Sequence, residues 1–408
     1  MSSTPNTNVS KPSRDQINAF RTDMFGRTKI SEAFTMFDSA HRYQDNGDYS
    51  DTHATNGTTT YDINQSSALL NVTNASGSET TRESKRVFPY QPGKSLQILQ
   101  TFVFAPAKTN LRQRAGYFTR KNGFYLEQDG TNIFLVKRTS ISGEMVETRI
   151  PQSEWNMDKL DGSGPSDVVL DLSKAQILFT EIEWLGVGSA RMGFAIDGYF
   201  IICHQFNHAN RIDSVYMTTA SLPVRYEITN TGATSGSSTL KQICTTVISN
   251  GGYFKPTELW TAVRQSASFT TSYYPLISVR LAPGREDAVV IPDVIDISPN
   301  SAGDFEFALV RNPTTLTGGT WVTHSPKNNV QYNSSATAVS GGTIIAQGYF
   351  ATTNQNTASA SITDSKNFAY QLGRTNADSP VSDVISLVIR TTSGNASAKS
   401  SFGWFDLL

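Results

Sequence analysis

The alternation of apolar and polar positions is clearest between residues 177 and 210, ILFTEIEWLGVGSARMGFAIDGYFIICHQFNHAN. Apolar residues share one face of the pattern, first Leu178, Ile182 and Trp184 and then Met192, Phe194 and Ile196. A period of two is typical of a half-buried strand. Asp197-Gly198 follows the second run, and both central positions of a two-residue hairpin turn favour residues that tolerate positive φ. The stretch therefore predicts two strands and a tight turn, with apolar faces that a second sheet must cover.

The same pattern recurs along most of the chain. GFYLEQDG and TNIFLVKRT flank Asp129-Gly130 and predict a second hairpin. From residue 274 onward, short apolar runs alternate with turn residues at the intervals of a β-sandwich. GGYFKPTELW and SASFTTSYY interrupt this rhythm between residues 251 and 275. We therefore predict an all-β protein with two sandwiches in series, residues 65–255 and 256–408, behind an extended N-terminal arm and polar segment, residues 1–64.

Composition supports this class and excludes several others. Charged residues make up only 17% of the 408 residues, whereas Ser, Thr, Asn and Gly recur throughout, as in turn-rich β proteins. The net charge is -1 and no basic run is present, so we expect no nucleic-acid partner. No secretory signal pattern and no apolar run of roughly 20 residues occurs, so neither export nor membrane insertion is predicted. The two cysteines, Cys203 and Cys244, have apolar neighbours and are interpreted as reduced core thiols.

The first 30 residues are polar except for Ile17, Phe20, Met24 and Phe25, whose spacing suits a short helix. Such a terminus gains order mainly by docking onto something else. We expect this arm to anchor the protein to a neighbour.

Glu181 and Glu183 project from one face of a predicted strand, in the sequence EIEWLG. β-Sandwich glycosidases of the laminarinase type place a nucleophile and a helper carboxylate in this way, as Glu-apolar-Asp followed by an acid three residues on. Here the middle acid is Glu183, and Gly186 stands where the final acid would be. Without that proton donor no turnover is expected. The two glutamates are then either a solvated strand face or part of a ligand-binding surface.

Trp155 lies in a polar excursion, residues 151–175, and either stacks on a sugar ring or fills the core. Trp155, Glu181 and Glu183 are the candidate ligand-binding residues, and no residue is predicted to be catalytic.

No metal or cofactor site is predicted. Asp45, Asp48 and Asp51 lack the spacing and closing Glu of an EF-hand loop, which favours a solvated loop. His204 and His208 have a spacing used in helical zinc sites, but they lie in or just after a strand and no third ligand accompanies them, which favours polar packing or surface placement. Gly93-Lys94-Ser95 resembles the end of a phosphate-binding loop, yet Phe88 replaces the required glycine.

Five blocks of the chain resemble virion structural proteins of tailed bacteriophages, many of them from aquatic environments. They span residues 90–104, 154–178, 191–210, 221–228 and 243–252, and include YQPGKSLQILQTFVF and RMGFAIDGYFIICHQFNHAN. The likeness covers roughly residues 80–255. Residues 260–408 resemble the companion C-terminal β domain in pattern only. The resemblance implies concanavalin-like or jelly-roll sandwiches carried on the particle, and it brings no catalytic residue with it.

The expected function is therefore a non-catalytic component of a neck, collar, tail or head appendage, assembled in the host cytoplasm. Its expected partners are other virion proteins, copies of itself in a homo-oligomer such as a trimer, and host-surface carbohydrate. The alternative is a tail protein that binds or degrades polysaccharide, because two-sheet sandwiches serve lectins, capsid decorations and hydrolases alike.

Overall fold

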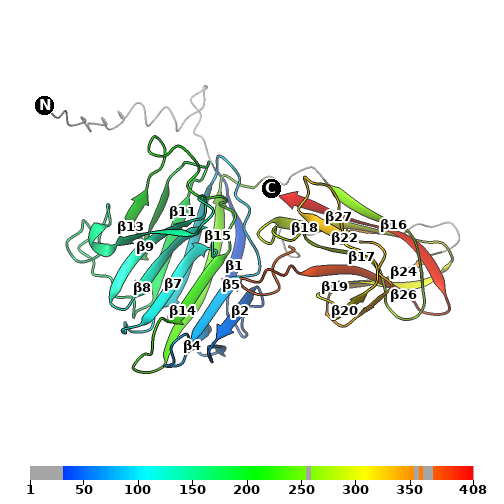
Figure 1. Ribbon diagram of the computed structural model, residues 1–408, viewed down its shortest axis with the longest axis horizontal. Coiled ribbons are helices and arrows are strands. Elements are labelled where there is room, and N and C mark those ends of the chain that lie inside the picture. The colour runs from blue at the N-terminus through cyan, green and yellow to red at the C-terminus, as the bar shows by residue number, and fades with distance from the viewer. Residues whose placement is uncertain (1–30, 254–258, 353–357, 362–370, 408) are drawn as a thin grey trace.

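The computed structural model describes residues 31–253, 259–352, 358–361 and 371–407. Strands account for the regular structure of these residues, apart from one 3-10 turn, η1 (Gln152–Glu154). Figure 1 shows the strands gathered into two bodies that follow each other along the chain. The predicted all-β class with two sandwiches in series is confirmed. Of the predicted N-terminal arm and polar segment, residues 1–64, residues 1–30 lie outside the described residues.

The first sandwich consists of two antiparallel sheets. The eight-stranded sheet runs β13 (Tyr199–Phe206), β12 (Ala190–Ile196), β11 (Gln176–Ile182), β6 (Ser95–Val103), β15 (Ser238–Asn250), β4 (Ser67–Val72) and β3 (Thr58–Asp62), with β1 (Ala33–Ala40) also paired to β15. The seven-stranded sheet runs β10 (Val146–Pro151), β9 (Asn132–Thr139), β8 (Gly123–Asp129), β7 (Leu111–Phe118), β14 (Val224–Asn230), β5 (Glu79–Ser84) and β2 (Tyr49–Ala54). This arrangement is a two-sheet antiparallel β-sandwich.

Alternation along each strand builds the core between these sheets. On β6 the residues at every second position are buried, among them Leu96, Ile98 and Phe102. Tyr117 on β7 and Tyr226 on β14 face them from the other sheet and are 0% exposed. Both inner faces are therefore covered, as the apolar stripes of the sequence require.

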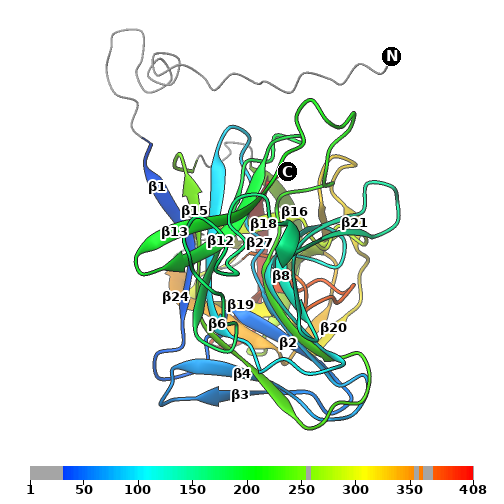
Figure 2. The same ribbon diagram turned by 90° about the vertical axis from the view of Figure 1, so that its left-hand side faces the viewer.

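The segment before residue 65 belongs to the sandwich. β1 and β4 pair with successive parts of the same edge of β15, and β2 extends the seven-stranded sheet beside β5. Figure 2 shows β1 beside β15, with β3 and β4 together at the lower end. The sandwich thus starts at β1 rather than near residue 65, and only the residues before Ala33 remain for an arm.

Both predicted hairpins form. Asp197 (φ 51°) and Gly198 (φ 82°) occupy the two central positions between the paired residues Ile196 and Tyr199. Both have the positive φ that a type I′ turn needs. The second turn is centred one residue later than predicted, because Asp129 itself pairs with Asn132 and Gly130 supplies the positive φ.

The two cysteines are free, and only one of them is in the core. Cys203 is buried, as predicted, but Cys244 is exposed. The pairing of β15 with β6 shifts register between Gln242 and Cys244, and this bulge turns Cys244 outward while Thr245 and Val247 face the core. The prediction of a core thiol at Cys244 is therefore wrong.

The second sandwich is smaller. Its four-stranded sheet runs β16 (Trp260–Phe269), β27 (Ala396–Leu407), β18 (Val289–Pro299) and β25 (Ala358–Ser361). Its six-stranded sheet runs β21 (Val322–Thr323), β22 (Val330–Asn333), β17 (Tyr274–Leu281), β26 (Val384–Thr391), β19 (Gly303–Arg311) and β24 (Thr343–Thr352), and a short pair joins β20 (Thr315–Thr317) to β23 (Ala338–Ser340). No helix within the described ranges is long and apolar enough to cross a bilayer.

The two sandwiches share a packed interface. Val289, Ile291, Phe405 and Leu407, from the second sandwich, belong to the same buried cluster as the core of the first. Arg225 of β14 in the first sandwich also donates hydrogen bonds to both carboxylate oxygens of Asp378, which belongs to the second. The contact therefore combines apolar burial with a bidentate ion pair.

Candidate functional site

Glu181 and Glu183 line a cavity of about 170 Å³ together with Ser189, Arg191 and Gln205. β11 ends at Ile182, so Glu181 is fixed by the sheet, whereas Glu183 stands on the turn that follows. β12 and β13 supply Arg191 and Gln205 from the neighbouring strands. The structure thus brings the two predicted glutamates to one small pocket, which we call the Glu181 pocket.

The Glu181 carboxylate is already occupied by protein groups. The Arg191 guanidinium forms an ion pair with it, and the Ser95 hydroxyl donates a hydrogen bond to Oε1 at 3.0 Å. The hydrogen bond to Glu181 raises the pKa of Arg191 above its ordinary value. Gly186, at the position of the missing proton donor, has φ 78° and forms part of a turn. This geometry suits a polar contact surface better than acid–base chemistry.

Of the two alternatives for Trp155, the structure shows the second: the side chain fills the core and is not available for stacking on a sugar ring. Its side chain is 3% exposed, packs in the main core, and donates its indole N–H to the Ile150 carbonyl at 3.2 Å. The polar segment that contains Trp155, residues 151–175, folds back on β13, where Met157 and Asp158 donate their backbone N–H groups to the Cys203 carbonyl. The apolar residues of the excursion thereby close the core beneath it.

His204 and His208 point to different partners rather than to a shared metal. His204 Nδ1 accepts a hydrogen bond from the Asn156 backbone, whereas His208 stacks on Tyr216 with ring centroids 3.8 Å apart. In the residues that the structure describes, no group of three or more His, Cys, Asp or Glu side chains is arranged to hold a metal ion. Polar packing therefore describes both histidines.

Two residues of the acidic cluster, Asp45 and Asp51, neutralise a buried arginine. Asp45 and Asp51 both form ion pairs with Arg82, whose side chain is 1% exposed. Burial alone would raise the pKa of Asp45, but the His41 hydrogen bond and the Arg82 charge outweigh it and hold that pKa below its ordinary value. Asp45 lies in a loop, as predicted, with its side chain 39% exposed, whereas the loop prediction is wrong for Asp51, which lies on β2 and is 21% exposed.

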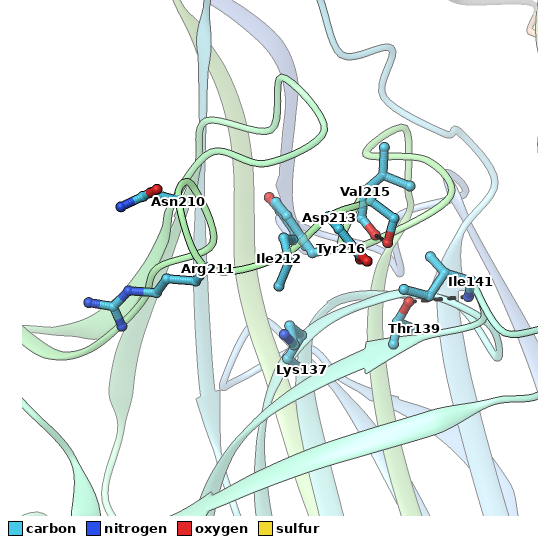
Figure 3. Close-up of a pocket in the computed structure, with 10 residues that line it drawn as sticks. Lys137, Thr139, Ile141, Asn210, Arg211, Ile212, Asp213, Val215 and Tyr216 are labelled. Carbon is cyan, nitrogen blue, oxygen red and sulfur yellow. Dashed lines mark hydrogen bonds between the residues drawn. The ribbon is translucent and has the colours of Figure 1, made fainter. Parts of the chain in front are cut away.

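A larger cavity, of about 710 Å³, lies at the end of β9 and is called the loop pocket here. Its lining comes from Lys137 and Thr139 of β9, from Ile141 just beyond, and from the loop formed by residues 210–216. Figure 3 shows Lys137 lying near Ile212 and Tyr216, with the Arg211 side chain directed away from it. The sequence analysis missed this site, because its loop carries no motif.

The outer face of the seven-stranded sheet carries a second feature that the sequence analysis missed. We call it the charged face, and its members are Glu83, Arg114, Glu127, Arg138, Glu147, Arg225 and Glu227. Arg114 binds Glu127 at 2.6 Å and Glu227 at 3.1 Å, and Arg225 binds Glu83 and Glu227, each at 2.7 Å. The signal in the sequence is that charged residues stand two apart in each strand, Arg112 and Arg114 in RQRAGYF and Arg225 and Glu227 in VRYEITN. These carboxylates have arginine partners and so are structural ions.

No protein-family model matches this chain, and no curated protein matches it either. Solved structures match about half of it. The Emp47p carbohydrate recognition domain is 11% identical over 54% of this chain and 98% of its own, with a TM-score of 0.35. The CBM2 module of the evolved Dit of Lactobacillus casei BL23 phage J-1 is 6% identical over 56% and 100%, with a TM-score of 0.34. A Bacteroides ovatus GH16 protein of a mixed linkage glucan PUL is 9% identical over 52% and 99%, with a TM-score of 0.35. Likeness at this level carries no conclusion about ligand or activity.

Proposed function

We propose that this protein is a multi-copy, non-catalytic structural component of a tailed-phage virion, in a neck, collar, tail or head appendage, that also contacts host-surface glycans. It would assemble in the host cytoplasm with other virion proteins and with copies of itself. The N-terminal arm or the second sandwich would attach it to the particle.

The observation that carries this proposal is where the virion-like blocks lie in the fold. Four of the five contain β6, the first three residues of β11, nearly all of β12 with the whole of β13, and most of β15, and these strands are neighbours in the eight-stranded sheet. The likeness therefore concerns one continuous piece of structure, which supports a shared architecture. The packed interface between the sandwiches supports a rigid projecting unit.

The proposal is tested on purified particles of the phage that encodes this chain. We expect mass spectrometry to detect the protein in multiple copies per virion, and cryo-electron microscopy to place two β-sandwiches in a neck, tail or head appendage. Absence of the protein from purified virions would overturn the proposal. Density in which residues 1–30 touch nothing would remove the anchoring role of the arm.

The enzymatic alternative is tested at the Glu181 pocket. Because Arg191 and Ser95 hold the Glu181 carboxylate, we expect the protein to release no reducing ends when it is incubated with purified host polysaccharide. If the wild-type protein releases reducing ends and Glu181→Gln does not, the structural proposal is wrong and the protein is a polysaccharide depolymerase.

A further inference from the structure

Lys137 occupies a position that the strand pattern reserves for core residues. On β9 the side chains of Ile133 and Leu135 pack in the core between the sheets, and Lys137 follows at the same parity. Its cross-strand partner on β8 is Phe124, which is 0% exposed. The ammonium group is thereby directed into the mouth of the sandwich, where the loop pocket opens.

His208 holds this ammonium group without neutralising it. His208 Nδ1 lies 2.7 Å from the Gly188 carbonyl, which can only accept, so the ring proton is on Nδ1. Nε2 is then an acceptor, and Lys137 Nζ donates to it at 3.2 Å. Burial lowers the pKa of His208, which keeps the ring neutral. Tyr216 stacks on the other side and fixes the ring plane.

Within the described residues, Lys137 has no carboxylate partner, in contrast to the arginines of the charged face. A half-buried ammonium without a counter-ion is an unfavourable arrangement unless an anion arrives from outside. The pocket therefore provides one fixed positive charge for a ligand.

The rest of the lining favours a sugar ring over an acidic peptide. Ile141, Ile212 and Val215 are 44%, 39% and 38% exposed and form apolar lining suited to the C–H face of a ring. Asn210 and Asp213 offer amide and carboxylate groups for hydroxyls. Asp213 would repel a chain with many negative charges, whereas it accepts hydrogen bonds from a ring that carries one carboxylate and several hydroxyls.

We propose that the loop pocket binds a carboxylated saccharide of the host surface, with the Lys137 ammonium pairing with the ligand carboxylate. His208 is a positioning residue, because it acts through Lys137. This inference rests on the glycan-contacting part of the proposed function and names the class of glycan.

The test is calorimetric titration of the full chain with oligosaccharides that end in glucuronate, galacturonate or N-acetylneuraminate. The same compounds with the carboxyl group reduced to an alcohol, and a tetraglutamate peptide, serve as matched ligands. We expect at least one acidic saccharide to bind and its reduced counterpart to bind about tenfold to hundredfold more weakly, the usual loss for one charge-assisted hydrogen bond.

Lys137→Met, which keeps the apolar stem, should weaken binding by the same factor, and Lys137→Arg should restore most of it. Lys174→Met is the control, because Lys174 is exposed, precedes the first residue of β11 and does not line the loop pocket. Equal binding of reduced and acidic ligands, binding of none of them, or tighter binding of tetraglutamate would each overturn the proposal. The comparison of ligands on the wild type needs no variant to fold. Since virion incorporation is measured separately, a virion protein that binds no acidic saccharide would refute this inference and leave the structural role intact.

Discussion

At the residue scale, single guanidinium groups hold together the buried charge of this protein. The Arg225 side chain is 2% exposed and contacts carboxylates of Glu83, Glu227 and Asp378. Removing one member of a buried ionic cluster leaves the others uncompensated, which costs far more than the cluster itself contributes. Substitution of Arg225 is therefore expected to be poorly tolerated.

Arg225→Met should lower the free energy of unfolding by about 3 to 5 kcal/mol, because three carboxylates lose their shared partner. Urea unfolding followed by tryptophan fluorescence measures the change. Arg120→Met is the matched control, since Arg120 binds the same Asp378 with a side chain that is 68% exposed. We expect the control to change stability by at most about 1 kcal/mol. Equal effects of the two substitutions would contradict the distinction.

Glu227 makes the stability of the folded protein depend on pH. Burial alone would raise its pKa, but the Arg225 and Arg114 charges outweigh burial and hold it at about 2, against an ordinary value of 4.5. The unfolded chain therefore binds more protons between these values, so this contribution is complete above pH 4.5 and is lost as the pH falls toward 2. Glu227→Gln should destabilise the protein by about 2 to 3 kcal/mol at pH 7, and its difference from the wild type should shrink in unfolding curves recorded at pH 3. A difference that grew in acid would be inconsistent with the ion pairs.

At the element scale, the strands and turns follow from local pattern, whereas their partners do not. The alternation and the Asp197-Gly198 pair predict the β12–β13 hairpin from residues that are adjacent in sequence. The pairing of β1 with β15 joins residues about 200 apart, and no local pattern marks it. The bulge at Gln242 and the burial of Trp155 also depend on distant partners. The two glutamates of the Glu181 pocket could be predicted, because the pocket is lined by residues of one continuous segment, from β11 to β13. The loop pocket could not, because Lys137 and Tyr216 come from separate segments.

The β12–β13 hairpin contains two glycines with different requirements, and alanine substitutions separate them. A Cβ at Gly193 would collide with the Ile201 carbonyl oxygen and lie 2.9 Å from the Phe179 ring, whereas a Cβ at Gly198 would meet nothing within 4 Å. Gly193→Ala should therefore displace β13 and cost about 3 kcal/mol or more, at the upper end of the usual cost of overpacking. Gly198→Ala should cost only about 1 to 2 kcal/mol, from its positive φ. Thermal unfolding of both variants measures this order, and a less stable Gly198→Ala would reverse it.

At the scale of the whole molecule, buried apolar contacts and an ion pair connect the two sandwiches. Val289, Phe405 and Leu407 continue the core of the first sandwich, and Asp378 reaches the charged face. Separate domains with small polar interfaces move independently by default. Here separation would expose apolar side chains and strip Arg225 of one of its carboxylates, which favours one rigid body.

The wild-type protein should accordingly unfold in a single calorimetric transition, even though each sandwich has sheets and a core of its own. Leu407→Ser combined with Asp378→Asn removes one apolar and one ionic contact from the interface while leaving the inner core of the second sandwich unchanged. We expect this double variant to show two transitions and a larger radius of gyration by small-angle X-ray scattering. Phe402→Ala is the control, because Phe402 is buried in the core of the second sandwich alone and should destabilise that sandwich without enlarging the molecule. Two transitions in the wild type would mean that the interface does not couple the sandwiches, and a rigid projecting appendage would then need its stiffness from the particle that carries it.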